Sequence, residues 1–446
     1  MPTRAEKIIL AVQEAGVVGA GGGGFPTHVK LQAQVDTVVA NGSECEPLLA
    51  SEKNLLTRHA GSVLEGLALA MEATGARRGL IAVKAHNHEA IQAIQEALAG
   101  GDGSIRIHLL ENYYPAGDEF LTVLDATGRV VPEGGLPPDV GVVVCNVLTL
   151  SQVADALHGK PVTERPVTVA GAVRRPVVVT APIGTPYADL VAKAGGTLRP
   201  DDALLDGGPM MGNRVADPRL GIARTTSGIL ALPADHLIMR LKKTSVAQMV
   251  KKSKAACCQC FRCTDLCPRR LLGHGLHPHL AMRSLDYGLA EPTGHVTAAF
   301  LCSQCGVCEL LACDAMLLSP RLVLAEYKKQ LVARGIRNPH KQASLSALPE
   351  MAYRRIPIST VLKKTGISEY VAETPFAGYL EAEQVRVPLS RHAGAAAAPR
   401  VKKGEKVKMG AAIAAPPAGK LGAVCHASIS GSVTAVNDDW IEISCS

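Results

Sequence analysis

The chain has 446 residues, of which 47% are apolar and only 3% are aromatic, and its formal charge is +7 at pH 7. This length predicts two to four domains, with ample apolar material for their cores. So mild a charge predicts no nucleic-acid partner, and the lack of any uncharged apolar run of roughly 18 residues predicts no transmembrane segment.

Residues 1–160 alternate apolar strand-like runs with helix-like segments. The expected strands cover residues 35–40, 80–83, 105–110 and 140–144, and the expected helices cover residues 55–74, 87–99 and 117–126. Strands that alternate with helices in this way predict a doubly wound α/β domain with a mostly parallel sheet.

A dense run of glycines lies near the start of this domain, from Gly19 to Gly24, followed by Phe25, Pro26 and Thr27. Glycine lets backbone N–H groups approach a phosphate or a ring without interference from a Cβ atom. The letters contain G-x-G-x-x-G, but a dinucleotide-binding fingerprint follows a strand, and here the preceding segment has a helical pattern. From these residues alone, a ligand-binding loop and a flexible surface loop are equal alternatives.

Residues 161–238 have a different texture, with β-branched runs and turns. Strands are expected at residues 167–171 and 177–180, and a short helix at residues 188–194 is closed by Gly195 and Gly196. This pattern predicts a small α+β module of the β-grasp type.

Residues 239–345 hold nine of the 13 cysteines of the chain. The first run is Cys257-x2-Cys260-x2-Cys263-x3-Cys267-Pro268, and the second is Cys302-x2-Cys305-x2-Cys308-x4-Cys313. The first run matches the spacing of bacterial ferredoxins, so we expect a helical domain of ferredoxin type that holds two 4Fe–4S clusters. Cysteines arranged for metal also indicate a reducing, cytosolic setting.

In two-cluster ferredoxins the fourth cysteine of each run binds the other cluster. This rule groups Cys257, Cys260 and Cys263 with Cys313, and Cys302, Cys305 and Cys308 with Cys267. The alternative metal is zinc, whose sites usually use two CxxC pairs, a spacing that fits poorly here. The second run has one extra residue before Cys313, and Asp314 stands where the first run has a proline. The spacing therefore does not determine the conformation of this loop. Cys258 is either an alternative ligand or an unligated small apolar residue.

Residues 385–446 return to short strands around glycine turns. Two such stretches, at residues 403–407 and 426–433, resemble the two halves of a barrel-sandwich domain of the biotinyl or lipoyl type. A carrier domain of that type would place a lysine at an exposed hairpin tip between the halves, and no such tip is evident. We therefore expect a structural or docking domain, reached through a linker at residues 390–400.

Several motifs together resemble known flavoproteins. They are the glycine loop with Phe25-Pro26-Thr27 and Lys30, the run from Asn41 to Pro47, the run from Tyr114 to Glu119, and the run from Asn146 to Thr149. This set resembles the FMN- and NADH-binding subunit of respiratory complex I, and still more the C subunit of Rnf-type ferredoxin:NAD oxidoreductases. The similarity covers residues 17–329, including the β-grasp module and the cysteine runs.

The resemblance implies two nucleotide cofactors. FMN would bind to Gly19, Gly21, Gly22, Lys30, Asn41, Tyr114, Gly117 and Asn146. NADH would face Phe25 and Glu46, with Asp118 and Glu119 nearby, and Glu44 would be a further cofactor-binding residue. Ser43 stands where complex I has an aspartate, so that contact does not carry over.

The order of the domains narrows the resemblance, because Rnf C subunits place their barrel-sandwich domain at the N-terminus. A C-terminal barrel is similar to the cobalamin (corrinoid) reductases of propanediol-utilisation bacterial microcompartments. This implies electron transfer from NADH through FMN and two 4Fe–4S clusters to cobalamin, taking Co(III) to Co(II) or Co(I) for adenosylcobalamin regeneration.

The same resemblance implies an adenosyltransferase and a shell protein as partners, and a location in the cytoplasm inside a microcompartment. The alternative is an Rnf-C-like electron-transfer subunit that links NAD(H) to ferredoxin or to a shell or membrane partner. Either way a flavin is needed, because NADH gives two electrons as a hydride while a cubane accepts one at a time.

Overall fold

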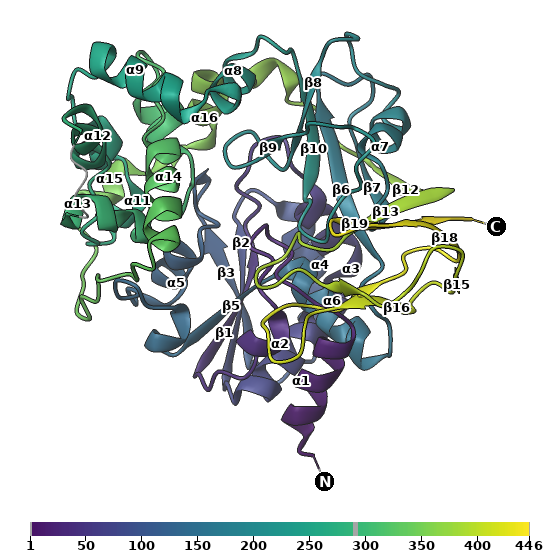
Figure 1. Cartoon of the computed structure of the whole chain (residues 1–446). Coiled ribbons are helices and arrows are strands. Elements are labelled where there is room, and N and C mark those ends of the chain that lie inside the picture. Colours follow the sequence, from purple (N-terminus) through teal and green to yellow (C-terminus); the bar gives the residue numbers. More distant parts are fainter. Residues whose placement is uncertain (1, 289–292, 446) are drawn as a thin grey trace.

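Figure 1 shows the protein as a computed structural model that describes residues 2–288 and 293–445. Met1, Ser446 and residues 289–292, which belong to the expected domains 1–160, 385–446 and 239–345, lie outside the described residues. In the part of the chain that is described, no helix combines the length and the apolar character that crossing a membrane requires.

The N-terminal domain is built on a four-stranded parallel sheet in the order β3-β2-β1-β5. The strands are β1 (Thr37–Gly42), β2 (Arg78–Lys84), β3 (Ile105–Leu110) and β5 (Val142–Asn146). One face is covered by α1 (Arg4–Glu14), α3 (Ser51–Thr74), α4 (His88–Leu98) and α6 (Val147–Leu157), and the other by α5 (Glu119–Thr127). Helices on both faces confirm the doubly wound prediction.

Two polar residues fix the helices that follow the strand ends. Asn146 ends β5 and caps α6, with its Oδ1 accepting from the Leu148 N–H at 2.9 Å. Asp118 caps α5 and accepts from the Phe120 N–H at 3.0 Å. Such caps satisfy N–H groups that have no partner within the helix. They therefore hold both helix starts at the carboxyl edge of the sheet.

The second module is a mixed sheet in the order β12-β7-β6-β10-β8-β9 with one packed helix, α7 (Tyr187–Lys193). Its strands are β6 (Glu164–Gly171), β7 (Val177–Pro182), β8 (Ala203–Asp206), β9 (Asn213–Arg214), β10 (Gly228–Leu232) and β12 (Phe376–Tyr379). The central pair β6 and β10 is parallel, whereas β6 and β7 are antiparallel. The prediction of a β-grasp type module is confirmed, with β12 joining it from far along the chain.

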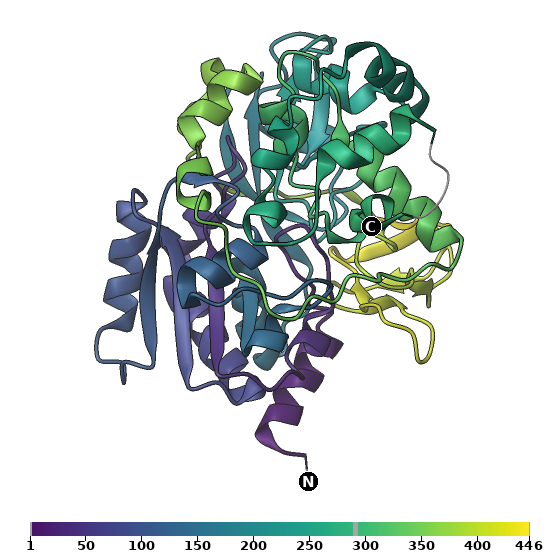
Figure 2. The same cartoon turned by 90° about the vertical axis from the view of Figure 1, so that its left-hand side faces the viewer.

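The cysteine runs lie in a helical domain, green in Figure 1. Its elements are α8 (Leu237–Lys243), α9 (Val246–Ala256), α10 (Arg262–Asp265), α11 (Pro268–Leu271), α12 (Pro278–Asp286), α13 (Gly294–Thr297), η2 (Ala298–Leu301), η3 (Val307–Ala312) and α14 (Pro320–Ala333). After it come α15 (Met351–Arg354) and α16 (Ile358–Thr365), and β11 (Ile356–Pro357), which pairs with β4 (Tyr113–Tyr114) of the first domain. Figure 2 shows these helices facing the viewer, beside and above the first domain.

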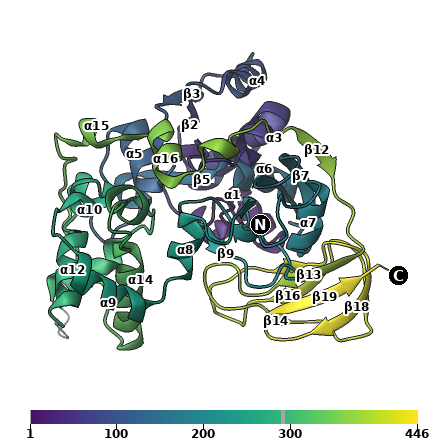
Figure 3. The same ribbon diagram turned by 90° about the horizontal axis from the view of Figure 1, so that it is seen from above.

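The C-terminal domain is a barrel of two small sheets around an apolar core, as predicted. One sheet holds β13 (Gln384–Pro388), β19 (Trp440–Ser444), β18 (Gly431–Val436) and β15 (Lys406–Val407), and the other holds β14 (Ala398–Pro399), β16 (Ala412–Ala415) and β17 (Cys425–His426). Figures 1 and 3 place it on the side of the molecule opposite the helical domain.

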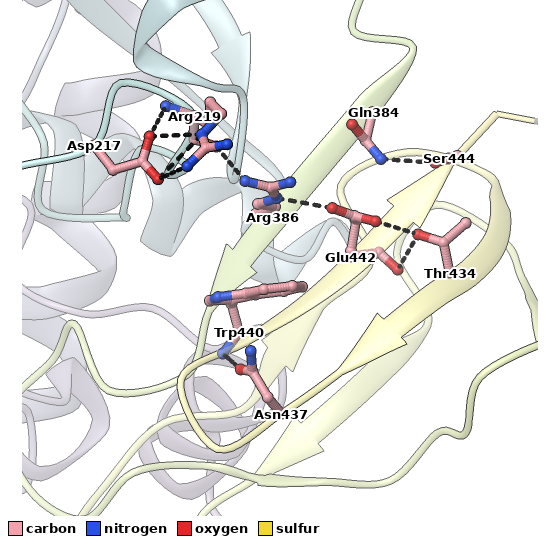
Figure 4. A network of polar contacts seen from close by, with 9 residues as sticks. All are labelled: Asp217, Arg219, Gln384, Arg386, Thr434, Asn437, Trp440, Glu442 and Ser444. Carbon is pink, nitrogen blue, oxygen red and sulfur yellow. Dashed lines mark hydrogen bonds and ion pairs between the residues drawn. The ribbon is translucent and has the colours of Figure 1, made fainter.

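Polar contacts fasten this barrel to the β-grasp module (Figure 4). Arg386 of β13 donates to Glu442 of β19 at 2.7 Å and to the backbone oxygen of Arg219 at 3.1 Å. Its guanidinium also lies 5.2 Å from the ring centroid of Trp440. One arginine thus joins two strands of the barrel to a loop of the neighbouring module.

Arg224 is a second junction, and it reaches the first domain. Its guanidinium donates to the backbone oxygens of Gly16 and Val424 at 2.8 and 2.7 Å, and lies 3.2 Å from Nδ1 of His392. Next to it, the Ala393 N–H donates to the Gly24 oxygen at 2.9 Å. The barrel therefore packs directly on the glycine loop.

Candidate flavin and iron–sulfur sites

Internal hydrogen bonds close the glycine loop, and one side of the loop is not covered by other residues. The Gly19 N–H donates to the Phe25 oxygen and the Gly24 N–H to the Gly19 oxygen, while the Ala20 N–H donates to Oγ1 of Thr149 on α6. A Cβ atom added at Gly22 or Gly23 would meet nothing within 4 Å, and Gly22 has φ +109°, which side chains rarely adopt. The loop therefore offers a bare backbone edge of the kind that a phosphate or a ring needs.

Polar side chains meet beneath this loop at the carboxyl ends of β1 and β5. A Cβ atom on Gly21 would lie 3.2 Å from Nδ2 of Asn146, so the loop rests directly on that side chain. Asn41 donates from Nδ2 to the Gly117 oxygen at 2.9 Å and accepts from the hydroxyl of Ser43 at 2.8 Å. Side chains at this edge are where open α/β sheets bind ligands.

Lys30 lies inside the same region. Its ammonium donates to Glu119 at 2.7 Å and to the Val144 oxygen at 2.8 Å. Burial alone would lower its pKa, but the carboxylate of Glu119 and the nearby Cys145 outweigh burial and the pKa is raised. Lys30 is therefore a fixed cation at the strand ends, suited to a phosphate or to the negative charge of a reduced ring.

Glu44 and Glu52 form a half-buried pair of acidic residues, of which sequence reasoning singled out only Glu44. Glu44 accepts from the Ser51 hydroxyl and from the N–H groups of Glu52 and Lys53, at the start of α3. Glu52 accepts from the Glu44 N–H and from Asn146. Burial, and then the charge of Glu44, raise the pKa of Glu52 to about 8. Burial and mutual repulsion therefore both favour the protonated form of this pair beside the predicted flavin residues.

Glu46 points to the β-grasp module. Its carboxylate accepts from the N–H groups of Met210 and Met211 at 2.9 and 2.7 Å, and burial raises its pKa. Phe25, by contrast, is half-buried at the end of the glycine loop. These two residues, expected to face NADH, thus lie on different elements, and Glu46 ties two modules together.

Tyr114 and Asp118 reach the cysteine domain. The Tyr114 hydroxyl donates to the Cys305 backbone oxygen at 2.5 Å, and Asp118 pairs with Arg269 at 2.6 Å, with both side chains of this ion pair 9% exposed. The guanidinium of Arg269 also lies 3.9 Å from the ring centroid of Phe120. Sequence reasoning missed Arg269, whose one signal is its place directly after Cys267 and Pro268.

The eight expected cysteine ligands line two separate cavities. One, which we call the outer cavity, is lined by Cys257, Cys260, Cys263 and Cys313, and the other, the inner cavity, by Cys267, Cys302, Cys305 and Cys308. Each cavity takes three cysteines from one run and the fourth from the other run. This is the crossed grouping that the ferredoxin rule predicts, and four thiols are the donor set of a cubane cluster.

The backbone repeats itself around the two cavities. Gln259 and Phe261 of the first run and Gln304 and Gly306 of the second run have positive φ angles between 53° and 80°. The next turn differs, because the first run continues as the α-helix α10 whereas the second continues as the π-helix η3. A π-helix accommodates one extra residue in a turn. It therefore absorbs the additional residue before Cys313.

Burial distinguishes the two cavities. In the outer cavity Cys260 and its neighbour Cys258 are exposed, whereas in the inner cavity Cys267 and Cys308 are buried. Burial raises the pKa of Cys305 to about 12, so as free thiols these groups would stay protonated, and a bound metal is what favours their thiolate form. Among the described residues, no three histidine, cysteine, aspartate or glutamate side chains converge closely enough for a single metal ion.

Family models match all four parts of the chain. They are the Nuo51 FMN-binding domain over residues 12–155, the SLBB domain over residues 166–214, the 4Fe-4S dicluster domain over residues 256–317 and the RnfC barrel sandwich hybrid domain over residues 364–443. The protein is therefore an oxidoreductase of the iron–sulfur flavoprotein class, with an FMN-binding domain and a domain for two 4Fe–4S clusters.

Whole-chain relatives define the family. Cobalamin reductase PduS of Citrobacter freundii is 41% identical over 442 residues, which are 98% of this chain and 96% of that protein. Cobalamin reductase PduS of Salmonella typhimurium is 41% identical over 446 residues, 99% of this chain and 97% of that protein. The chain belongs to the PduS cobalamin reductase family.

More distant relatives share part of the chain. The C subunit of the Na(+)-translocating ferredoxin:NAD(+) oxidoreductase complex of Acetobacterium woodii is 37% identical over 273 residues, 60% of this chain and 59% of that protein. Among solved structures, an NAD+-reducing [NiFe]-hydrogenase matches with a TM-score of 0.47 and 22% identity, over 79% of this chain and 70% of that one.

Proposed function

We propose that this protein is an NADH-dependent cobalamin reductase that passes electrons from NADH through FMN and two 4Fe–4S clusters to the cobalt of cobalamin. The observation that carries the proposal is the 41% identity to cobalamin reductases over 96% and 97% of their lengths. In electron balance, one NADH gives NAD+, a proton and two electrons, which reduce two Co(III) ions to Co(II) or complete two steps on one cobalt.

The flavin would be held at the carboxyl edge of the first sheet. Gly19, Gly21 and Gly22 would offer the loop backbone, and Lys30 the cation for a phosphate or ring charge. Asn41, Tyr114, Gly117 and Asn146 would form the floor, and Glu44 would bring a half-buried carboxyl group. When bound, FMN exchanges electron pairs with NADH and single electrons with the clusters. The open face beside Gly22 and Gly23 supports this placement, because it leaves room for a bound ring or phosphate.

NADH would approach on the side of Phe25 and Glu46, with Asp118 and Glu119 nearby. Asp118 and Glu119 already pair with Arg269 and Lys30. We therefore infer that these two acids act on the nucleotides by holding their cationic partners in place, whereas Phe25 is free to contact a ring.

Residues predicted to bind the nucleotides directly contact the lining of the inner cavity, so we take this cavity to be the nearer of the two to the flavin. The Tyr114 hydroxyl donates a hydrogen bond to the backbone oxygen of Cys305, and Asp118 forms an ion pair with Arg269. Both Cys305 and Arg269 line the inner cavity. The outer cavity has exposed residues around it, including Phe261, which is 45% exposed. We infer that the inner cysteine set receives electrons first and that the outer set delivers them to the acceptor.

The test uses anaerobically purified protein freed of unbound FMN, since free reduced flavin also reduces cobalamin. NADH is expected to bleach the bound flavin, then lower absorption near 400 nm, and to reduce cob(III)alamin. A variant with Cys302, Cys305 and Cys308 all replaced by alanine should keep flavin bleaching and lose most cobalamin turnover. Wild-type turnover in that variant would make the flavin the exit point and contradict the proposed route.

The second candidate is an Rnf-C-like electron-transfer subunit that links NAD(H) to ferredoxin or to a shell or membrane partner. The 37% identity to an Rnf C subunit favours it, although that match covers only 60% of this chain. Reduced ferredoxin separates the two, because it should exchange electrons with this protein at least tenfold faster than cobalamin does if the second candidate is correct.

We further propose an adenosyltransferase and a shell protein as partners, and a location in the cytoplasm inside a bacterial microcompartment. The supporting argument is chemical, because Co(I) is a short-lived nucleophile and is best passed directly to the enzyme that alkylates it. Co-purification of an adenosyltransferase with intact microcompartments that hold this protein would support the proposal, and recovery of the protein only outside them would oppose it.

A further inference from the structure

The positive charge of the chain is concentrated in the cysteine domain. Residues 239–345 hold 16 lysines and arginines against six acidic residues, which gives this domain a formal charge of +10. The whole chain carries only +7, so the remaining residues together carry −3. Bound clusters would offset only part of this charge, since four thiolates around one iron–sulfur core leave a small net negative charge. An asymmetry of this kind between domains indicates a charged partner.

Most of these cations have no carboxylate partner. Among the described residues, ion pairs occupy only Arg262, Arg269 and Arg321 of the 16. Arg262 shares its partner Asp314 with Lys364 of α16, at 3.3 and 2.5 Å, so this acid lies between two cations. The positive charge of the domain is therefore largely uncompensated by the side chains that the structure describes.

Helix α9 brings part of this charge to the outer cavity. It carries Lys251, Lys252 and Lys254, all exposed, and it has no acidic residue. The ammonium of Lys252 donates to the Leu317 oxygen at 3.0 Å, and both sequence neighbours of Leu317 line the cavity. The helix leads directly into Cys257, so Lys254 lies within one helical turn of the first cysteine of the run. Lys251 and Lys254 share one face of the helix, where like charges repel, and a negatively charged partner would relieve that repulsion.

The acidic residues near the outer cavity are few. Asp314 is the one acid of its lining, and it is held by the two cations named above. Asp265 and Asp286 end the two helices, α10 and α12, that contribute further lining residues. His279 lines the cavity too, but burial lowers its pKa, so it adds no charge at neutral pH. Among the described residues, the lysines of α9 and the two cations on Asp314 thus outnumber the acids at this rim.

Apolar side chains are exposed at the same place. Phe261 and Met316 line the outer cavity and are 45% and 40% exposed. Tyr287, which follows α12, is 63% exposed. Cys258 and Cys260 of the first run are exposed as well. Exposed apolar side chains within a charged rim are typical of sites that bind another protein.

We propose that the face around the outer cavity is the docking surface for an acidic protein that carries the electron acceptor. Acidic side chains of that partner would meet the lysines of α9, and its apolar surface would meet Phe261 and Met316. One electron would leave the outer cluster and enter the acceptor of the partner, with no bond formed or broken. The inference rests on the proposed route, in which the outer cysteine set delivers the electrons.

The charge of this surface also bears on the form in which a corrinoid arrives. Free aquacob(III)alamin is a cation, and the basic rim would repel it. An acidic protein that presents the corrinoid would instead be attracted. Electrostatic attraction of this kind gives fast association through a small contact area, as transient electron-transfer complexes have.

The probes for the test are two small haem proteins that each accept one electron, the acidic cytochrome b5 and the basic cytochrome c. Both are mixed with the flavin- and cluster-loaded protein. We expect NADH-driven reduction of cytochrome b5, and its affinity in titration calorimetry, to fall at least tenfold between about 10 and 200 mM salt. Cytochrome c should show no such fall. A rate and an affinity for cytochrome b5 that do not depend on salt would overturn the proposal.

A charge-reversal variant locates the docking surface. It combines Lys251→Glu, Lys252→Glu and Lys254→Glu, and at low salt it should lose at least tenfold in both rate and affinity with cytochrome b5. NADH should bleach its flavin at the wild-type rate, because the change lies outside the flavin domain. If the triple variant loses its iron, Lys251→Glu alone decides, with a loss of several-fold expected and unchanged affinity overturning the proposal.

The matched control makes the same change of net charge on the barrel, on the opposite side of the molecule (Figures 1 and 3). It combines Lys402→Glu, Lys403→Glu and Lys408→Glu, three exposed lysines. This variant should keep most of the wild-type rate and affinity with cytochrome b5. Equal losses in the two triple variants would reduce the effect to net charge and overturn the docking surface.

Two further measurements separate the alternatives. Vesicles of phosphatidylglycerol test an anionic membrane as the occupant, and vesicle binding that only the α9 variant loses, with unchanged cytochrome b5 kinetics, would overturn the proposal in favour of a membrane. Protein reduced with dithionite and freed of excess reductant tests the docking surface apart from the proposed function. It should reduce cytochrome b5 with the same salt dependence even if NADH proves not to be the electron donor.

Discussion

The hydroxyl of Tyr114 donates a hydrogen bond of 2.5 Å to the backbone oxygen of Cys305. It connects the motif predicted to hold a flavin with the loop predicted to hold a cluster, and Tyr114 is only 1% exposed. The ion pair between Asp118 and Arg269 makes a second link between the same two parts. The loops predicted to hold the flavin and the cluster are thus held in register by these two contacts.

Arg269→Met should destabilise the protein by about 3–5 kcal/mol, because it leaves the buried Asp118 carboxylate without its cationic partner. Thermal unfolding with matched cluster content measures the loss. The control is Arg262→Met, which breaks a more exposed pair with Asp314 and should cost about 0–1 kcal/mol. Equal stability of the two arginine variants would show that the buried pair contributes no more than the exposed one.

Tyr114→Phe removes one hydrogen bond and should slow cluster reduction by NADH while flavin bleaching stays normal.

Crossed ligation predicts that a ligand change in one run damages the cluster of the other run. Wild-type protein should contain about eight irons per chain, and Cys267→Ala should lose the cluster of Cys302, Cys305 and Cys308. Cys263→Ala should instead lose the outer cluster. Electron paramagnetic resonance of the dithionite-reduced variants identifies which cluster remains. Loss of the same cluster in both variants would mean sequential ligation.

Lys30→Ala and Asn41→Ala each remove a polar contact from the predicted flavin floor. A charge-assisted or buried contact contributes roughly 1–3 kcal/mol, so FMN affinity should fall by about 5- to 150-fold. Flavin content and iron content are measured on the same preparations, and iron should stay normal. FMN binding unchanged in both variants would remove the glycine loop from the flavin site.

The junction of the barrel should weaken in acid. Burial, together with Arg224, lowers the pKa of His392 and of His426 to about 4. Between pH 4 and 6.5 the folded state therefore binds fewer protons than the unfolded state, so the free energy of unfolding decreases as the pH falls through this window and is unaffected above it. Fluorescence of Trp440, the one tryptophan of the chain, reports on the barrel.

Double replacement of His392 and His426 by glutamine should flatten this pH dependence. His88→Gln, at an exposed site on α4, serves as the control and should leave it as in the wild type. A wild-type acid transition in the double variant would assign it to other groups.

The grouping of the eight candidate cysteines into two sets could be predicted from the sequence, because their spacing limits which thiols can surround one cubane. The cavities group the same cysteines that the spacing did. The path of the chain before Cys313 could not be predicted, since an extra residue fits either a loop or a π-helix. Hydrophobic periodicity likewise predicted the parallel sheet, whose strands lie within a few residues of the expected ranges.

Polar contacts between residues far apart in the chain could not be predicted from the sequence. Nothing in the spacing indicates that Asp118 pairs with Arg269, or that Glu46 accepts from Met210. Each of these contacts joins residues more than 140 positions apart, and Met210 contributes only a backbone N–H, a group that nearly every residue type carries. Glu52 was missed for a similar reason, because only the folded helix start brings it against Glu44.

The hydrogen bond from Ala393 to Gly24 has a consequence for biosynthesis. The glycine loop leaves the ribosome long before Ala393, because the β-grasp module and the cysteine domain lie between them in the chain. The predicted flavin site consequently gains this neighbour only after both of those domains have been made. We therefore expect a chain that stops before the barrel to retain flavin less tightly than the full chain does.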